Sequence, residues 1–177
     1  MTTIRPALAA DVDQITDIYN ALLETTTYEW TETRHTVTEV ARWLADQEAD
    51  DWPVLVAVDG DRVVGWATYG DFRDSRSRPG YRFTVEHSIH IRQDSWGRGT
   101  GRALMARLAE HANRAGKRVL VAAIDASNEP SMAFHARLGF TEVARMPGVG
   151  EKWGKRLDLV LMQHDVGELA RSTDEVG

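Results

Sequence analysis

Cysteine is absent from this 177-residue sequence, and its absence narrows the chemistry that the protein can perform. Without cysteine there is no disulfide bond, no thiolate metal site and no covalent cysteine intermediate. An acyl transfer must therefore use another nucleophile or pass directly between two substrates. We expect no metal cofactor.

Long apolar runs are also lacking. No stretch reaches the roughly 18 to 20 apolar residues of a membrane-spanning helix. Residues 1–13 do not show the basic and then apolar layout of a signal peptide. These features predict a cytoplasmic protein with no membrane partner. The formal net charge of −6 argues against nucleic acid as the main partner.

Apolar residues make up 42% of the chain, which suits one compact core. Periodic patterns predict an α/β domain with a mixed sheet over residues 1–164, followed by a polar tail at 165–177 that we expect to fray. Strands are predicted at 3–6, on both sides of a tight turn at 59–61, and at 82–92, 117–124, 140–145 and 157–163. Helices are predicted after Asp11, at about 36–50, at about 100–115 and at 128–138.

A glycine-rich turn joins the strand predicted at 82–92 to the helix predicted at 100–115. Gly97, Gly99 and Gly101 let the backbone approach a ligand closely, and the N–H groups of the first helical turn point at it. Residues 92–118 also carry seven Lys or Arg against two acidic residues. A solvated helix face would explain these charges equally well, but beside the glycines they favour a pyrophosphate site.

Two common phosphate motifs do not fit this turn. A P-loop needs Gly-Lys-Ser/Thr, and the dinucleotide pattern needs a third glycine at the position of Arg102. The remaining pattern, G-x-G-x-G between a strand and a long helix, resembles the coenzyme A pyrophosphate loop of the GNAT N-acetyltransferases. Trp96 stands where that family usually has Gln or Arg. We expect Trp96 to alter packing rather than abolish binding, since the family's core contacts come from backbone N–H groups.

Three further segments extend the resemblance to about residues 3–163. Asn128 with the FHARLGF run at 134–140 is similar to the family's second signature, and 84–91 resemble the strand before the turn. Residues 149–163 are close to the branch of the phosphinothricin and methionine sulfone/sulfoximine acetyltransferases, although Lys152 and Trp153 within them receive no role. The resemblance implies a GNAT-like α+β fold: a mixed, mostly antiparallel central sheet of six to seven strands flanked by about four helices.

The resemblance also implies acetyl-CoA as co-substrate, with its pyrophosphate on the glycine turn and its pantetheine arm along the preceding strand. The strand would then need a bulge or a splayed neighbour to free its main chain; ordinary pairing within the sheet is the alternative. Asn128 is either a ligand contact, a helix N-cap, or both. The implied acetyl-CoA contacts are Ile89, His90, Ile91, Gly97, Arg98, Gly99, Thr100, Gly101, Arg102 and Asn128.

Two side chains are candidates for acid–base catalysis. Glu86 matches the family's glutamate and would take a proton from the amine, directly or through a water; alternation places it with Ser88 and His90 on one face. A half-exposed strand face is the alternative, and a bulge would bring His87 to the same side. His135 stands at the family's proton-donor position, and the alternative is a packed histidine on an apolar helix.

The acceptor is predicted to be a small amino acid or analogue. Arg73 aligns with an arginine of the branch and would bind a carboxylate, although extra loop residues leave Arg76 or Arg78 as alternatives. Tyr81 would form a wall of the pocket. The resemblance also implies a homodimer. Two other functions stay open: a protein lysine or N-terminal acetyltransferase, and a non-catalytic coenzyme A-binding module.

Overall fold

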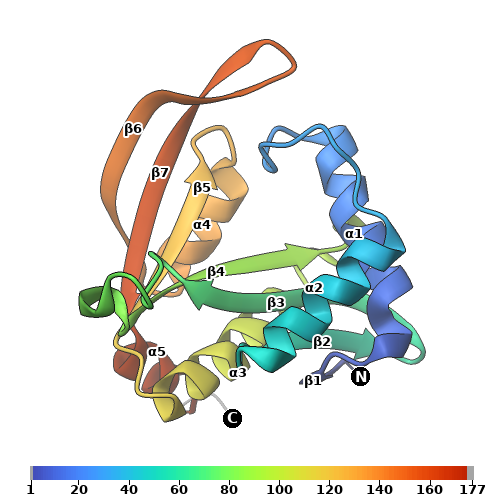
Figure 1. The fold of residues 1–177 in the computed structure, drawn as a ribbon, viewed down its shortest axis with the longest axis horizontal. Helices are drawn as coiled ribbons and strands as arrows, with labels where there is room; N and C mark the ends of the chain where they lie inside the picture. Colours follow the sequence, from blue (N-terminus) through green and yellow to red (C-terminus); the bar gives the residue numbers. More distant parts are fainter. Residues whose placement is uncertain (1, 175–177) are drawn as a thin grey trace.

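The computed structural model describes residues 2–174, which form one seven-stranded sheet with helices on both faces (Figure 1). All neighbouring strands are antiparallel except β4 and β5, which are parallel. The mixed, mostly antiparallel sheet expected from the sequence is confirmed. In the sheet order β1-β2-β3-β4-β5-β7-β6, the strands are β1 (Thr3–Pro6), β2 (Val54–Asp59), β3 (Arg62–Asp71), β4 (Thr84–Ile91), β5 (Val119–Asp125), β7 (Lys155–Asp165) and β6 (Thr141–Lys152).

Helices cover the sheet because the central strands bury both of their faces. In the β2–β3 pair, Val56 and Trp66 share the face covered by α1 and α2, whereas Leu55 and Ala67 face the core beneath α3 and α5. Such two-sided burial explains why both strands read as nearly continuous apolar runs. The α-helices of the described residues are α1 (Val12–Thr25), α2 (Val37–Ala49), α3 (Thr100–Arg114), α4 (Glu129–Arg137) and α5 (Val166–Asp174), and short 3₁₀ turns lie at Ala9–Asp11, Pro79–Tyr81 and Gln93–Ser95.

The sheet opens at the parallel pair β4–β5. These strands are paired only where Thr84, Val85 and Glu86 face 119–121. Beyond Glu86 each strand keeps its outer neighbour, β3 along β4 and β7 along β5, and the two strands diverge (Figure 1). The sheet therefore opens in a V, and this opening creates the site described below.

The C-terminal segment differs from the expected fraying tail. Its residues through Asp174 form α5, which buries Val166, Leu169 and Ala170 in the core that α3 also lines. Three apolar residues at helical spacing were too short a pattern to outweigh their polar neighbours in the sequence. Residues 175–177 of the predicted tail lie outside the described residues.

The β6–β7 hairpin is longer than the sequence patterns at 140–145 and 157–163 predicted. It extends beyond the rest of the sheet (Figure 1), and it turns at Trp153 and Gly154, both with positive φ. Strand β6 is mostly exposed and its register shifts twice, so its distal half lacks the alternating pattern that identifies a strand in sequence. Within residues 2–174, no helix has the length and apolar character needed to cross a membrane.

Candidate active site

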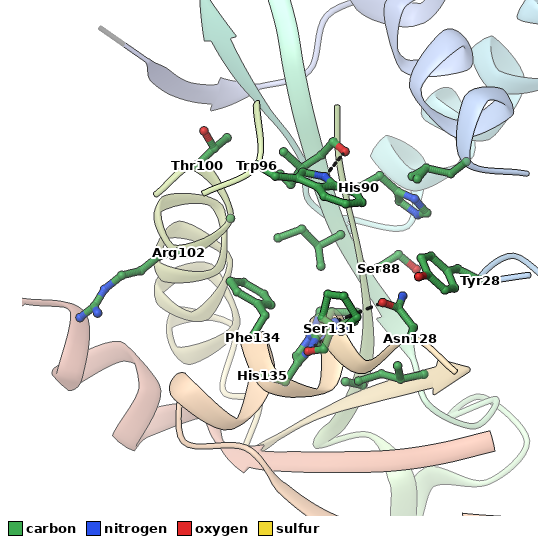
Figure 2. A pocket seen from close by; sticks show the side chains of 18 of the residues that line it. Tyr28, Ser88, His90, Trp96, Thr100, Arg102, Asn128, Ser131, Phe134 and His135 are labelled. Atoms are coloured by element: carbon green, nitrogen blue, oxygen red, sulfur yellow. Dashed lines mark hydrogen bonds between the residues drawn. The ribbon is translucent and has the colours of Figure 1, made fainter. Parts of the chain in front are cut away.

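A cavity of about 550 Å³ occupies the opening between β4 and β5, a size typical of small-molecule sites. Its walls are the diverging halves of these two strands, the glycine turn before α3, the first turn of α3, one side of α4, and the loop after α1 (Figure 2). The cavity thus joins segments that are separated by about a hundred residues of sequence, including 28–29 and 128–135.

The glycine turn has the geometry of an anion cradle. Gly99 immediately precedes α3 and has a φ of 82°, a conformation that other residues rarely adopt. The first backbone N–H groups of α3 lack intrahelical acceptors, and the helix dipole adds positive potential there. At Gly101 a Cβ atom would lie 3.1 Å from the ring of Phe134. A pyrophosphate therefore fits this turn, with Arg102 on the cavity wall; Arg98 is exposed and does not line the cavity.

Trp96, the departure from the family motif, packs back onto β4. Its indole Nε1 donates a hydrogen bond of 2.9 Å to the carbonyl oxygen of Ile91, although the side chain remains 47% exposed (Figure 2). The tryptophan therefore ties the turn to the end of the strand and leaves the helix N-terminus accessible.

The far half of β4 faces the cavity because β5 has moved away. Ser88, Ile89, His90 and Ile91 line one wall, and residues 122–125 of β5 line the opposite wall. An extended ligand can lie along such an unpaired strand edge and bond to its main chain. Of the ten implied acetyl-CoA contacts, all except Arg98 line the cavity.

Glu86 lies where β4 and β5 are still paired, and Arg73 and Tyr81 lie in the segment between β3 and β4. None of the three lines the cavity itself. Burial raises the pKa of the half-buried Glu86, and the nearby positive charge of Arg73 partly offsets this rise. The Arg73 guanidinium lies 5.2 Å from the ring centre of Phe72, and Tyr81 is 6.2 Å from the same ring. The structure therefore brings the candidate base close to the candidate carboxylate-binding arginine.

His87 points to the opposite face of β4, since the register with β3 is regular throughout. There its Nε2 lies 2.9 Å from Nε2 of His135, a contact between residues 48 positions apart. Nδ1 of His87 lies 2.9 Å from the carbonyl oxygen of Val121. Nδ1 of His135 lies 2.8 Å from the carbonyl oxygen of Ser131. Burial lowers the pKa of both rings, that of His135 to about 4. Two neutral rings carry only two N–H groups, so at most two of these three contacts are hydrogen bonds at one time.

Asn128 caps α4, and it also lines the cavity. Its Oδ1 accepts a hydrogen bond of 3.1 Å from the backbone N–H of Ser131 (Figure 2). This cap leaves the amide nitrogen of Asn128 as the group suited to a ligand carbonyl. The hydroxyl of Ser131 lies 3.3 Å from Nδ1 of His135, so a proton on His135 has a polar neighbour on the cavity wall.

Sequence reasoning missed the carboxylate of Glu29, which also lines the cavity. Its Oε2 accepts a hydrogen bond of 3.1 Å from the Tyr19 hydroxyl, and its Oε1 lies 3.5 Å from Nε2 of His90. Burial raises the pKa of Glu29 and lowers that of His90 to about 4. The adjacent Tyr28 lines the cavity as well. No local pattern distinguishes Glu29, because its partners come from α1 and β4.

In the part of the chain that the structure describes, no cluster of three His, Cys, Asp or Glu could hold a metal ion.

Comparison with known proteins agrees with this geometry. Residues 15–140 match the Acetyltransferase (GNAT) family. An L-methionine sulfoximine/L-methionine sulfone acetyltransferase from Salmonella typhimurium is 40% identical over 95% of this chain and 96% of its own length. A phosphinothricin N-acetyltransferase from Alcaligenes faecalis is 33% identical over 91% of this chain and 81% of its own.

Among solved structures, a Salmonella typhimurium acetyltransferase determined with its cofactor acetyl-CoA superposes with a TM-score of 0.88. It is 39% identical, and the match covers 94% of each chain. The fold, the cradle at the start of α3 and these relatives lead to one assignment. The chain belongs to the GNAT family of acetyltransferases and is an acetyl-CoA-dependent N-acetyltransferase.

Proposed function

We propose that the protein acetylates the amino group of a small amino acid or analogue of the methionine sulfone, methionine sulfoximine or phosphinothricin type. The observation that carries the proposal is the opening between β4 and β5. In this opening, the glycine turn before α3 and the unpaired edge of β4 line one cavity. At the end of the cavity where β4 and β5 come together, Glu86 and Arg73 lie beside it. The substrates named for the relatives fit a site with a cation for a carboxylate and a base for an amine.

Acetyl-CoA supplies an activated acetyl group as a thioester, and the chain supplies its binding. The first-turn N–H groups of α3 hold the pyrophosphate, and Arg102, whose side chain points away from the cavity in Figure 2, adds positive charge to the same turn. The main chain of Ser88, Ile89 and His90 aligns the pantetheine arm, as a neighbouring strand would. The amide nitrogen of Asn128 contacts the same arm near its thioester end.

Glu86 acts as the general base. An alkylamine is mostly protonated near pH 7 and must lose a proton before its nitrogen can attack a thioester carbonyl. The pKa of Glu86 is raised by burial, which brings it closer to the working pH and makes it a stronger base. Because Glu86 does not line the cavity, a bound water carries the proton from the amine to its carboxylate.

His135 returns a proton to the departing sulfur. Its pKa of about 4 leaves the ring neutral near pH 7, so the proton that it donates must come from the reaction. The ammonium substrate loses its first proton to Glu86 before attack, and the nitrogen loses a second proton after it has bonded to the carbonyl carbon. His135 takes up this second proton and passes it to the sulfur. Nε2 of His135 is occupied by the buried His87, which leaves Nδ1 and the Ser131 hydroxyl as the route to the cavity. The C–S bond breaks as the C–N bond forms, and no acyl-enzyme is involved.

Arg73 binds the carboxylate of the acceptor, and Tyr81 encloses it. Arg76, the alternative considered from the sequence, forms an ion pair with Asp50 at the surface.

We further propose a cytoplasmic homodimer, because acetyl-CoA is an intracellular metabolite and exposed apolar side chains lie along the β6–β7 hairpin. These are Val143, Met146, Val149 and Trp153. Sedimentation velocity of the parent and of a Met146→Lys, Val149→Lys variant tests the dimer.

A thiol-release assay tests the function. Methionine sulfone, phosphinothricin and a lysine-containing peptide are each supplied with acetyl-CoA, and the free thiol is measured over time. We expect release with at least one of the two amino acids and an N-acetylated product by mass spectrometry. Turnover of the peptide alone would assign a protein acetyltransferase. Tight acetyl-CoA binding without any release would indicate a non-catalytic module.

A further inference from the structure

Lys152 is buried to an extent that is rare for lysine, with 1% of its surface exposed. It lies at the end of β6, and its ammonium group donates three hydrogen bonds to backbone carbonyls on a different part of the chain. The acceptors are Leu23 at 2.6 Å, Thr26 at 2.9 Å and Glu29 at 2.8 Å. An ammonium group has three donors, so all of them are satisfied by the end of α1 and the loop that follows.

The loop at 26–32 has further anchors across the opening of the sheet. The Trp30 indole donates a hydrogen bond of 3.0 Å to Oδ2 of Asp125 at the end of β5. The Trp30 ring also packs so closely on Gly150 of β6 that a Cβ atom there would collide with it. At the hairpin turn, the backbone N–H of Trp153 donates to Glu32.

These contacts connect the β6–β7 hairpin to one wall of the cavity, because the same loop carries Tyr28 and Glu29. Figure 1 shows the loop after α1 reaching toward the strands on the other side of the opening. Burial lowers the pKa of Lys152, whereas the charges of Glu29 and Glu32 raise it. Removing the ammonium group would leave three carbonyls without their donor in a buried site.

We infer that Lys152 is a positioning residue for the acceptor side of the active site: its ammonium group holds the 26–32 loop so that Tyr28 and Glu29 face the cavity. The inference rests on the proposed function in one respect, that the acceptor amine enters beside this loop. It also assigns a role to a residue of the 149–163 segment that the sequence left without one. The proposed acetyl-CoA contacts lie on β4, on the glycine turn, at the start of α3 and at Asn128, and none lies in the 26–32 loop. We therefore expect Lys152 to act on the acceptor and not on the donor.

The first test replaces the charge and keeps the volume. Lys152→Met should raise the KM for the amine about tenfold or more and change the acetyl-CoA dissociation constant by less than about twofold. Hydrogen exchange of the amides at 26–32 should quicken in the variant, whether or not the enzyme turns over. Lys155→Met is the matched control, since Lys155 pairs with Lys152 across the hairpin but is exposed. It should alter neither quantity.

The second test restores the charge chemically and decides the question if Lys152→Met folds poorly. The chain has no cysteine, so Lys152→Cys introduces a unique thiol. Alkylation in denaturant with 2-bromoethylamine rebuilds a lysine-length ammonium side chain, and 1-bromopropane builds an uncharged one of the same length. After refolding beside an identically treated parent, the aminoethylated protein should regain the parent's KM and slow exchange, and the propylated protein should not.

Equal recovery with both reagents would overturn the inference, because packing alone would then hold the loop. An unchanged amine KM and unchanged exchange in Lys152→Met would also overturn it, as would an equal weakening of acetyl-CoA binding. If the parent itself released no thiol with any amine, the proposed function would fail. The exchange of the 26–32 amides would still decide whether Lys152 holds the loop.

Discussion

The donor side and the acceptor side of the cavity are built from different parts of the chain. The proposed donor side consists of residues 88–102, a continuous segment that offers mainly backbone groups at a strand edge and a helix N-terminus, together with Asn128. The proposed acceptor side combines the 26–32 loop, which the side chains of Lys152 and Trp30 hold in place, with Glu86 and the 71–82 loop, which lie beside the cavity. A backbone site tolerates many side-chain changes, whereas a site of converging side chains depends on each of them.

This difference predicts which substitutions affect which substrate. Changes on the donor side should act on acetyl-CoA binding only where they obstruct the backbone. Changes on the acceptor side should act on the KM for the amine or on turnover and leave acetyl-CoA binding intact. The following substitutions test that separation.

The largest effect is expected for Glu86→Gln, which keeps the shape of the side chain but cannot accept a proton. Its kcat at pH 7 should fall about 10² to 10⁴-fold, the usual contribution of a general base. In the parent, kcat should fall as pH drops through the raised pKa of Glu86, above the ordinary range of a glutamate. The deficit of the variant should shrink at high pH, where more amine arrives deprotonated. A loss below about fivefold at pH 7 would remove Glu86 from this role.

His135→Ala should lower kcat about 10²-fold and leave acetyl-CoA binding unchanged. The deficit should be greatest at high pH, where solvent protons are scarce and the leaving sulfur depends most on a protein donor. Rate profiles against pH for the parent and the variant measure this. A deficit that is constant across pH would instead indicate a packing role beside Phe134 and Phe140, whose rings contact His135.

Gly101→Val obstructs the backbone on the donor side, because its added atoms press on Phe134. The side chain also blocks the approach of the pyrophosphate to the backbone, so the acetyl-CoA dissociation constant should rise about 10 to 100-fold, at about 1.4 kcal/mol for each factor of ten. Acetyl-CoA at about 100 times its dissociation constant should stabilise the parent by about 2.7 kcal/mol, and the variant should lose most of this thermal shift. Gly80→Val is the control, since a Cβ there meets nothing within 4 Å. If acetyl-CoA stabilised Gly101→Val as much as it stabilises the parent, acetyl-CoA would have to bind at another place in the protein.

Arg73→Ala should raise the KM for a carboxylate-bearing amine about tenfold, equivalent to about 1.4 kcal/mol. Arg76→Ala serves as its control, because Arg76 pairs with Asp50 at the surface and should have little effect. Steady-state kinetics at saturating acetyl-CoA measure both. Equal effects, or the reverse order, would show that the carboxylate is bound by another part of the loop.

The smallest effect is expected for Trp96→Phe. The substitution removes one partly exposed hydrogen bond to Ile91 and keeps an aromatic ring. At about 0.5 to 1.5 kcal/mol for such a bond, the acetyl-CoA dissociation constant should change by about tenfold at most. A larger change, measured by calorimetry, would mean that the indole itself contacts the ligand.

The donor side was largely predictable from the sequence because its signals are local. The glycines, the following helix and the alternating pattern of the preceding strand all lie within residues 84–114. The opening between β4 and β5 has no such signal, since both strands keep their patterns after they part. The His87–His135 contact and the carbonyl acceptors of Lys152 join residues 48 to 129 positions apart, and no local pattern indicates such pairs.

Direct transfer between the two sides is the central claim, and a thiol measurement in two stages tests it. Excess enzyme is mixed with acetyl-CoA alone, free thiol is recorded, and methionine sulfone is then added. The account predicts no burst in the first stage, and one thiol released per N-acetylated product after the amine arrives. A burst of thiol equal to the acetyl-CoA supplied, before any amine is present, would reveal an acetylated enzyme and contradict the account.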